Sequence, residues 1–391
     1  MLKDVLSTRL AALELEDLYR NLRLVEGRQE SKVVIDGREV LMLASNNYLG
    51  LANHPLLKKA AQEAIKQFGC GSGSSRLISG TMELHEQLES RIAELKHTEA
   101  ALVFPTGYHA NVGTISSIMT RGDVILSDEL NHASIIDGCR LSHANTLVFR
   151  HNDMGHLAHL LDSCRGYENR LIVVDSVFSM DGDIAPLDEI STLARQHKAW
   201  MMVDEAHATG VFGPNGAGIA EEFNLSSEIE IQMGTLSKAL GGSGGYVAGS
   251  RELVNWLINR ARSFVYSTAL PPTVTATAIA AIDIVSNEPK RRQQLRDNAD
   301  FLAKELTTLG YTLANSRSQI LAIIIGATSQ TMALAAELFS QGIFAPGIRP
   351  PTVPDNTSRI RLTPMASHTP EDMEYTVSAF AEAGKKLGLL S

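Results

Sequence analysis

The stretch "WMMVDEAHATG" (Trp200–Gly210) passes from an apolar run to acidic and imidazole side chains within a few residues. A short apolar run without polar alternation is typical of a strand covered on both faces of a mainly parallel sheet. Asp204 follows the run directly, and His207 comes three residues later. Because open α/β sheets bind ligands at the carboxyl ends of their strands, this stretch predicts a strand that ends in a polar site.

Similar apolar runs on both sides extend the pattern, with helical segments between them. The clearest helix is "TMELHEQLESRIAELKH" (Thr81–His97), which has an apolar residue at every third or fourth position. The alternation predicts an α/β fold with a mostly parallel central sheet flanked by helices. The expected strands are Ala101–Phe104, Val124–Leu126, Leu147–Phe149, Leu171–Val174, Trp200–Val203, Ile229–Met233 and Tyr246–Ala248.

A break near Leu270-Pro271-Pro272 is followed by long helical segments and the strand-like "QILAIIIG" (Gln319–Gly326). We therefore expect three regions. Residues 1–44 form an N-terminal helical segment with short strands, residues 45–280 a large α/β domain, and residues 281–391 a smaller C-terminal α+β domain. A chain of 391 residues is long enough for two domains.

The composition excludes several classes of protein. A net charge of −9 and the lack of a dense basic block argue against a surface for nucleic acid or anionic membranes. The three cysteines have no C-x-x-C spacing, so neither a disulfide framework nor a zinc site is expected. The N-terminal residues lack the apolar core of a secretory signal, and no apolar run approaches the length of a membrane span. A cytoplasmic location is the simplest expectation.

The tract "GTLSKALGGSGG" (Gly234–Gly245) contains a single charge, Lys238. A P-loop places its glycines before the lysine, whereas here they follow it, so a P-loop is excluded. Without a P-loop, the letters D-E-A-H at Asp204–His207 do not indicate a helicase. Two interpretations of Lys238 remain from the tract alone: a solvated loop lysine, or an amine whose pKa is lowered in a dry pocket so that it forms a Schiff base.

Two further segments decide between these interpretations. "FPTGYHAN" (Phe104–Asn111) predicts a strand, a turn at Gly107 and Tyr108, and a helix whose N-terminus suits a phosphate. "DELNHASIIDG" (Asp128–Gly138) places His132 in a loop after a strand. A Schiff-base lysine, a carboxylate that keeps a pyridine nitrogen protonated, a phosphate-binding helix and a stacking histidine together predict a pyridoxal phosphate site.

At this point the sequence resembles the α-oxoamine synthase family, whose members have the type I fold of aspartate aminotransferase and depend on pyridoxal 5'-phosphate. The resemblance covers nearly the whole chain. It rests on "SNNYLGLANHP", "GSGSSRLISGT", "NHASIIDGCRLS", "DSVFSMDGDIAPL", "VDEAHATGVFGPNGAG" and "GTLSKALGGSGGYVAG", which occur in the family's order and spacing.

The resemblance implies a set of cofactor-binding residues. Lys238 is expected to form the Schiff base, Asp204 to pair with the pyridine nitrogen, and His132 to stack on the ring. The remaining cofactor contacts are His207 and Ser179 near the phenolic oxygen, Thr235 and the backbone of Gly107 and Tyr108 at the phosphate, and Ser267 or Thr268 from a neighbouring subunit. The last contact implies a homodimer with its active site at the subunit interface.

The resemblance also implies the reaction. The segment "GIRPPTVPDNTSRIRLTPMASHT" (Gly347–Thr369) is similar to the branch of acyltransferases that condense L-alanine with a pimeloyl thioester in biotin biosynthesis. Asn46 and Arg361 are expected to bind the amino-acid carboxylate, because a guanidinium grips a carboxylate bidentately. Arg20 and Thr352 match positions that contact the acyl substrate.

Three alternatives remain open at this stage. A glycine C-acetyltransferase would use glycine and acetyl-CoA, and an aminotransferase would share Lys238 and Asp204 but ignore thioesters. The third alternative is a non-catalytic binding protein, which would not need all of the cofactor-facing residue types that this sequence contains. The sequence also leaves open whether the acyl carrier is coenzyme A or acyl-carrier protein.

Overall fold

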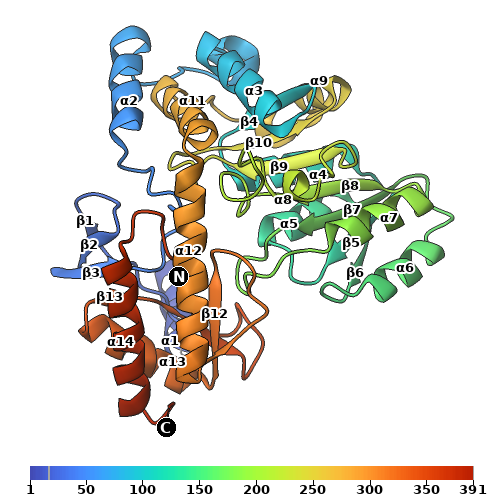
Figure 1. Cartoon of the computed structure of the whole chain (residues 1–391). Coiled ribbons are helices and arrows are strands. Elements are labelled where there is room, and N and C mark those ends of the chain that lie inside the picture. Colours follow the sequence, from blue (N-terminus) through green and yellow to red (C-terminus); the bar gives the residue numbers. More distant parts are fainter. Residues whose placement is uncertain (16–17, 391) are drawn as a thin grey trace.

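The apolar runs predicted as strands lie together in one sheet of the computed structural model, which describes residues 1–15 and 18–390. Within these residues seven strands form the sheet in the order β4-β10-β9-β8-β7-β5-β6 (Figure 1). β10 is antiparallel to both neighbours, and the other adjacent pairs are parallel, which confirms the predicted mostly parallel sheet. The strands are β4 (Ala100–Phe104), β5 (Val124–Asp128), β6 (Asn145–Phe149), β7 (Arg170–Asp175), β8 (Trp200–Asp204), β9 (Ile231–Thr235) and β10 (Gly245–Gly249).

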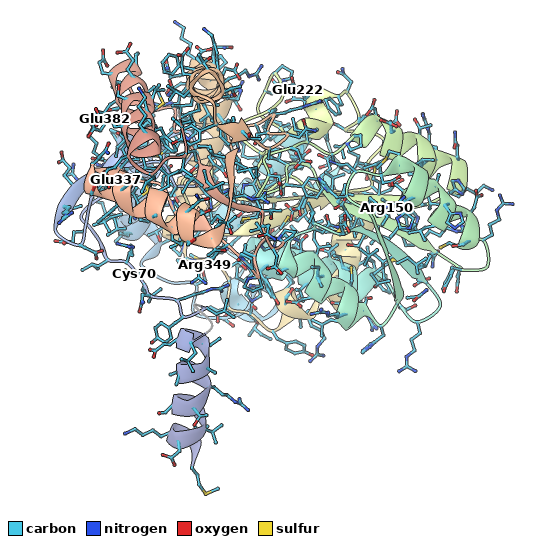
Figure 2. All side chains as sticks on the ribbon, turned by 90° about the horizontal axis from the view of Figure 1, so that it is seen from below. Cys70, Arg150, Glu222, Glu337, Arg349 and Glu382 are labelled. Carbon is cyan, nitrogen blue, oxygen red and sulfur yellow. The ribbon has the colours of Figure 1, made fainter. Side chains whose placement is uncertain are left out.

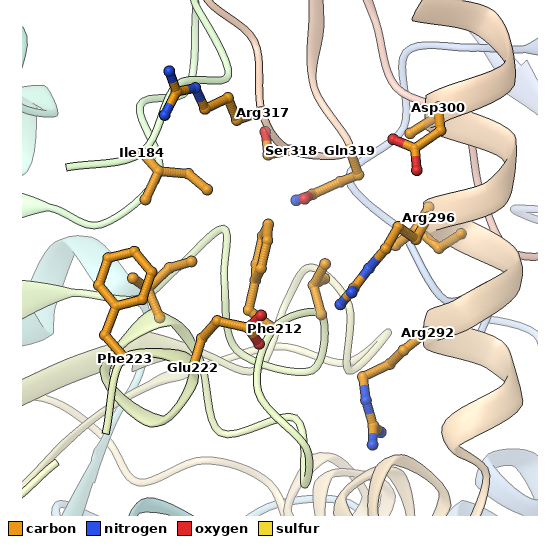
Figure 3. Close-up of a pocket in the computed structure, with 14 residues that line it drawn as sticks. Ile184, Phe212, Glu222, Phe223, Arg292, Arg296, Asp300, Arg317, Ser318 and Gln319 are labelled. Atoms are coloured by element: carbon orange, nitrogen blue, oxygen red, sulfur yellow. The ribbon is translucent and has the colours of Figure 1, made fainter. Parts of the chain in front are cut away.

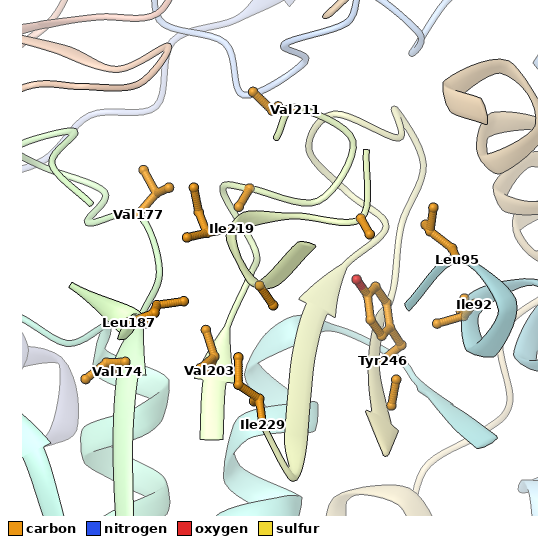
Figure 4. Close-up of a cluster of buried hydrophobic side chains, with 14 of the residues drawn as sticks. Ile92, Leu95, Val174, Val177, Leu187, Val203, Val211, Ile219, Ile229 and Tyr246 are labelled. Carbon is orange, nitrogen blue, oxygen red and sulfur yellow. The ribbon is translucent and has the colours of Figure 1, made fainter. Parts of the chain in front are cut away.

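Both faces of this sheet are covered, as the missing polar alternation predicted. Successive side chains of β8 enter different buried clusters: Met201 and Val203 join one, and Met202 joins the other. Part of the first cluster, with Val203 and Tyr246, is shown in Figure 4. Helices on that face include α3 (Glu83–Lys96), α6 (Met154–Ser163), α7 (Leu187–His197) and α11 (Pro272–Asn287); the other face is covered by α4 (Gly107–Ile118), α5 (Ala133–Ser142) and α9 (Arg251–Arg260). The predicted helical stripe of α3 is buried at Leu84, Leu88, Ile92 and Leu95.

The C-terminal region forms a second core. Its antiparallel sheet has the order β11-β12-β15-β14 and packs against α12 (Pro289–Leu309), α13 (Thr328–Ser340) and α14 (Pro370–Lys386), which lie together at one end of the molecule (Figure 1). Leu306, Ile323 and Phe380 are fully buried there. The strands are β11 (Thr312–Leu313), β12 (Leu321–Gly326), β14 (Gly347–Ile348) and β15 (Ser358–Leu362).

The N-terminal strands join this C-terminal region. β3 (Arg38–Met42) pairs with β13 (Ile343–Phe344) in parallel. With β1 (Val25–Glu26) and β2 (Lys32–Ile35) they form a four-stranded sheet in the order β1-β2-β3-β13. The helix α1 (Leu2–Leu15) has no buried residue and projects from the body (Figure 2). The boundaries 1–44, 45–280 and 281–391 stay a prediction, and residue 280 lies inside α11.

Shorter elements connect these parts. They are α2 (Pro55–Phe68), a π-helical turn (Arg76–Gly80), α8 (Ile219–Glu222) and α10 (Arg262–Val265). Among residues 1–15 and 18–390, no helix combines the length and apolar character needed to cross a bilayer.

Candidate active site

A cavity of about 210 Å³ lies where several parallel strands of the central sheet end. Asp175, Asp204 and Thr235 are the last residues of β7, β8 and β9, and the turns after β4 and β5 supply the rest of this wall. The sheet therefore brings to one edge residues that are far apart in the sequence. Of the predicted cofactor contacts, the cavity is lined by Gly107, Tyr108, His132, Ser179, Asp204, His207, Thr235 and Lys238.

Asp204 is held by contacts to both carboxylate oxygens. Its Oδ1 accepts the amide of Ala206 at 2.8 Å, and its Oδ2 accepts the side-chain amide of Asn111 at 2.7 Å. Asn111 lies on α4 and is buried, and it also donates to Ser134 at 2.9 Å. Since each oxygen has a fixed donor, the carboxylate has one orientation toward the cavity. This is the property required of a group that stabilises a cationic ring nitrogen.

A second buried carboxyl lies beside the first. Asp175 faces Asp204 in the register of β7 and β8. Burial and the charge of Asp204 raise the pKa of Asp175 well above its ordinary value, although its bond from the His132 amide, at 2.7 Å, acts in the opposite direction. Asp175 thus fixes the backbone of His132 while holding a proton more readily than an ordinary aspartate.

His132 caps the N-terminus of α5 through its ring. Its Nδ1 accepts the backbone N–H of Ser134 at 3.2 Å and lies 2.7 Å from the Ser134 hydroxyl. An Nδ1 that accepts leaves the proton of the neutral imidazole on Nε2. Burial lowers the pKa of His132, an effect that Asp204 opposes and Lys238 reinforces, so the neutral form is favoured.

Lys238 is half-buried in the wall of the cavity. Burial lowers the pKa of its amine, while the charges of Asp204 and Asp175 partly restore it. The charge of Arg361 adds to the lowering. The amine therefore gives up its proton more easily than an exposed lysine, which is what Schiff-base chemistry requires. This environment favours the pocket interpretation of Lys238 over a solvated loop lysine.

Beyond His207, hydrogen bonds lead to the predicted carboxylate-binding residues. The Tyr48 hydroxyl lies 2.6 Å from His207 Nδ1 and 3.1 Å from Asn46 Oδ1. Arg361 donates from Nε to the Ser179 carbonyl at 2.6 Å and from Nη2 to Asn46 Oδ1 at 3.4 Å. Burial and the charges of Lys238 and Arg361 hold the pKa of His207 well below its usual value. The structure thus brings Asn46 and Arg361 to the same site as Ser179 and His207.

The end of the cavity at α4 has the form of an anion site. Thr106 caps the helix by accepting the His109 amide at 3.2 Å, and the amides of Gly107 and Tyr108 have no acceptor within the described part of the chain. A side chain at Gly245 would bring its Cβ to 2.6 Å from the Gly107 nitrogen, so this close approach of β10 requires glycine. Free amides at a helix start suit a phosphate, so the residues fit the cofactor that the sequence predicts.

The remaining predicted contacts lie outside this cavity. Arg20 and Thr352 are exposed at the surface. Ser267 and Thr268 line a different, very small cavity, and Thr268 bridges to Ser75. Their predicted roles, in acyl binding and across a subunit interface, stay predictions.

The sequence prediction missed several residues that line the cavity or hold its members: Tyr48, Asn111, Ser134, Asp175 and Ser237. Asp175 carried a usable signal, because it ends an apolar strand as Asp204 does. Asn111 had none, since a lone asparagine on a predicted helix is ordinary.

Comparison with known proteins agrees with this geometry. Residues 38–380 match the family model described as aminotransferase class I and II. The chain is 52% identical to the 8-amino-7-oxononanoate synthase of Geobacter sulfurreducens over 97% of its own length and 98% of the relative's. It is 48% identical to the protein of that name from Lysinibacillus sphaericus over the full length of both.

A solved structure is similar over almost the whole chain. A lysine-to-alanine variant of the serine palmitoyltransferase of S. paucimobilis, with a bound PLP–myriocin aldimine, superposes with a TM-score of 0.93 at 32% identity, covering 99% of this chain and 98% of that one. The chain therefore belongs to the class I and II aminotransferase family and, within it, to the 8-amino-7-oxononanoate synthases.

Proposed function

We propose that this chain catalyses the decarboxylative condensation of L-alanine with a pimeloyl thioester, which gives 8-amino-7-oxononanoate, CO2 and a free thiol. The convergence of Lys238, Asp204, His132 and His207 on one cavity beside the start of α4 carries the proposal. The relatives at about half identity bear the name of this activity. When bound, pyridoxal phosphate supplies an aldehyde that condenses with amines and a pyridinium ring that stabilises negative charge at an α-carbon.

The residues of the cavity hold this cofactor at both ends. Lys238 would bind it covalently through Nζ, and Asp204 would pair with its ring nitrogen. The amides of Gly107 and Tyr108, with the Thr235 hydroxyl, would bind its phosphate. Because Asn111 fixes the Asp204 carboxylate, the carboxylate would need no reorientation to stabilise a protonated ring nitrogen.

Substrate handling falls to the other groups. Arg361 binds the carboxylate of alanine with the guanidinium N–H groups that are not used in its bonds to Ser179 and Asn46. Once the amino group of alanine has displaced it, the freed Lys238 Nζ, with its lowered pKa, would take the α-proton. His132 carries its proton on Nε2 and donates a hydrogen bond to the thioester carbonyl oxygen as negative charge develops there.

A homodimer completes the proposal. Leu77, Ile78 and Tyr266 are 50%, 80% and 73% exposed, respectively. The bridge from Ser75 to Thr268 joins the two segments that contain them. Exposed apolar residues around a predicted subunit contact support burial against a second copy. In that arrangement Ser267 or Thr268 reaches the partner's phosphate.

The decisive experiment offers the purified holoenzyme L-alanine with pimeloyl-CoA or pimeloyl-acyl-carrier protein and identifies the product by mass. A product of the mass of 8-amino-7-oxononanoate is expected, and the two donors separate the possible acyl carriers. Glycine with acetyl-CoA in a parallel reaction tests the acetyltransferase alternative. Lys238→Ala is expected to lose both the visible absorption of the bound cofactor and turnover, and full activity of this variant would contradict the scheme.

A further inference from the structure

A tight hairpin follows β7 and contacts the C-terminal region. It spans residues 177–184, whose two end residues pair in an antiparallel bridge. The carbonyl of Gly182 accepts the backbone amide of Arg317 at 2.9 Å and the hydroxyl of Ser318 at 2.8 Å. Figure 3 shows Ile184, the last residue of the hairpin, lining the same cavity as Arg317 and Ser318. The hairpin is therefore part of the contact between the loops of the central sheet and the C-terminal region.

The strand β15 rests on this hairpin through two buried arginines. Arg361 donates from Nε to the carbonyl of Ser179, which lines the catalytic cavity, at 2.6 Å. Arg359 donates to the Met180 carbonyl at 3.4 Å and pairs with Asp181. The position of the Arg361 guanidinium therefore depends on where the hairpin lies.

His151, in the loop after β6, ties the same hairpin to the central sheet. Its ring Nε2 lies 2.7 Å from Asp183 Oδ2, and its Nδ1 lies 3.0 Å from Oδ1 of Asp128, the last residue of β5. The ring also meets Phe178 edge-on, with 4.4 Å between the ring centroids. Since each ring nitrogen faces a carboxylate, both nitrogens carry a proton and donate it. The imidazolium thus bridges the hairpin and the end of β5.

The two carboxylates depend on this cation. Asp128 and Asp183 are only 2% and 6% exposed. Within the described part of the chain, the ion pair of Asp183 is with His151, and Asn152 adds a neutral donor to Oδ2 at 2.8 Å. The other oxygen of Asp183 is enclosed without a donor among the described residues. A buried carboxylate that loses its cation is strongly destabilised, so loss of the charge at position 151 should displace the hairpin.

We propose that His151 is a positioning residue for amino-acid binding, because it ties Asp183 to the end of β5 and so holds the hairpin that orients Arg361. The inference rests on the proposed function, in which Arg361 binds the carboxylate of alanine. His151 is not among the described residues that line the catalytic cavity. It therefore acts through Asp183 and Ser179 and not by contact with the substrate.

The test compares two dissociation constants. The Kd of L-alanine is measured from the change that it causes in the cofactor absorption of the holoenzyme, and the Kd of pyridoxal phosphate by titration of the apoenzyme. His151→Gln and Asp183→Asn are each expected to raise the Kd of L-alanine at least about fivefold. The Kd of pyridoxal phosphate should stay within about twofold, because Lys238, Asp204 and the start of α4 hold the cofactor independently of the hairpin. The double variant leaves no charge unpaired at position 183, so its Kd for L-alanine should not exceed that of His151→Gln.

A matched variant separates positioning from a general loss of stability. Tyr311→Phe removes a buried hydroxyl that donates to the Phe380 carbonyl at 2.9 Å in the C-terminal core. It should leave both dissociation constants within about twofold of the unsubstituted enzyme. Hydrogen exchange followed by mass spectrometry should show faster exchange of residues 177–184 in His151→Gln and no change there in Tyr311→Phe.

The outcomes are distinct. The proposal is overturned if His151→Gln leaves the Kd of L-alanine or the exchange of residues 177–184 unchanged, or if Tyr311→Phe raises this Kd as much. Asp183→Asn, which leaves His151 paired with Asp128, is judged by the same criteria if His151→Gln does not fold. An unsubstituted holoenzyme that does not respond to L-alanine would contradict the proposed function instead, and the exchange measurement would still decide whether His151 holds the hairpin.

Discussion

Replacing Asn111 with leucine tests the role of a cavity residue that gave no signal in the sequence. Leucine keeps nearly the shape of asparagine, but the variant loses the bonds to Asp204 Oδ2 at 2.7 Å and to Ser134 at 2.9 Å. Of its two side-chain contacts within the described residues, Asp204 then keeps the Ala206 amide on Oδ1. A hydrogen bond to a charged group contributes about 1.5–3 kcal/mol. The preference of the Asp204 carboxylate for its present orientation is therefore reduced by a factor of about 10 to 150.

This loss should appear in cofactor binding and in turnover together. The apolar neighbour also desolvates Asp204, which disfavours the charged form that the ring nitrogen requires. We expect the Kd of pyridoxal phosphate, measured by absorption titration of the apoenzyme, to rise at least about tenfold. The kcat for L-alanine with pimeloyl-CoA should fall by a similar factor.

A matched variant separates this effect from general damage to α4. Ser116→Ala removes a hydroxyl whose one bond among the described residues goes to the Val112 carbonyl of the same helix, so both constants should stay near those of the unsubstituted enzyme. Thermal unfolding of the apoenzymes checks that both variants fold. If Asn111→Leu bound the cofactor and turned over within about twofold of the unsubstituted enzyme, the orienting role of Asn111 would be wrong.

Three further predictions concern binding and stability. Arg361→Lys should raise the KM for L-alanine about tenfold with a smaller change in kcat in steady-state kinetics, because lysine cannot grip a carboxylate bidentately; an unchanged KM would contradict the assignment. Lys96→Met should lower the free energy of unfolding in urea by about 3–5 kcal/mol, since it leaves the fully buried Glu205 carboxylate without its cation 4.0 Å away; adding Glu205→Gln should recover part of the loss. Burial lowers the pKa of His151, but its bonds to two aspartates outweigh this effect and raise the pKa to about 10. The contribution of His151 to the stability of the fold is therefore full below the ordinary pKa of 6.5 and is lost as the pH rises through about 10. His151→Gln should flatten the dependence of unfolding free energy on pH between these values, and an unaltered slope would refute this cause.

Patterns of local periodicity account for the parts of the fold that the sequence predicted. Runs such as Leu171–Val174 are apolar at every position because the sheet is covered on both faces. This pattern can be recognised from consecutive residues alone. The stripe on α3 is likewise local. Strand order and the antiparallel direction of β10 depend on pairing between segments far apart. No periodicity within one segment encodes them.

The same limit explains which site residues escaped prediction. Asp128, Asp175 and Asp204 each end an apolar strand, so the local pattern assigns all three the same role. In the structure, Asp128 bonds His151 at 3.0 Å, outside the cavity. Asp175 accepts the N–H at the start of α5, and only Asp204 receives the amide of Asn111 from α4. What distinguishes the three carboxylates is the helix or loop that the fold brings to each strand end. Which helix or loop this is depends on the order of the strands in the sheet, and the strand that carries the aspartate does not reveal it.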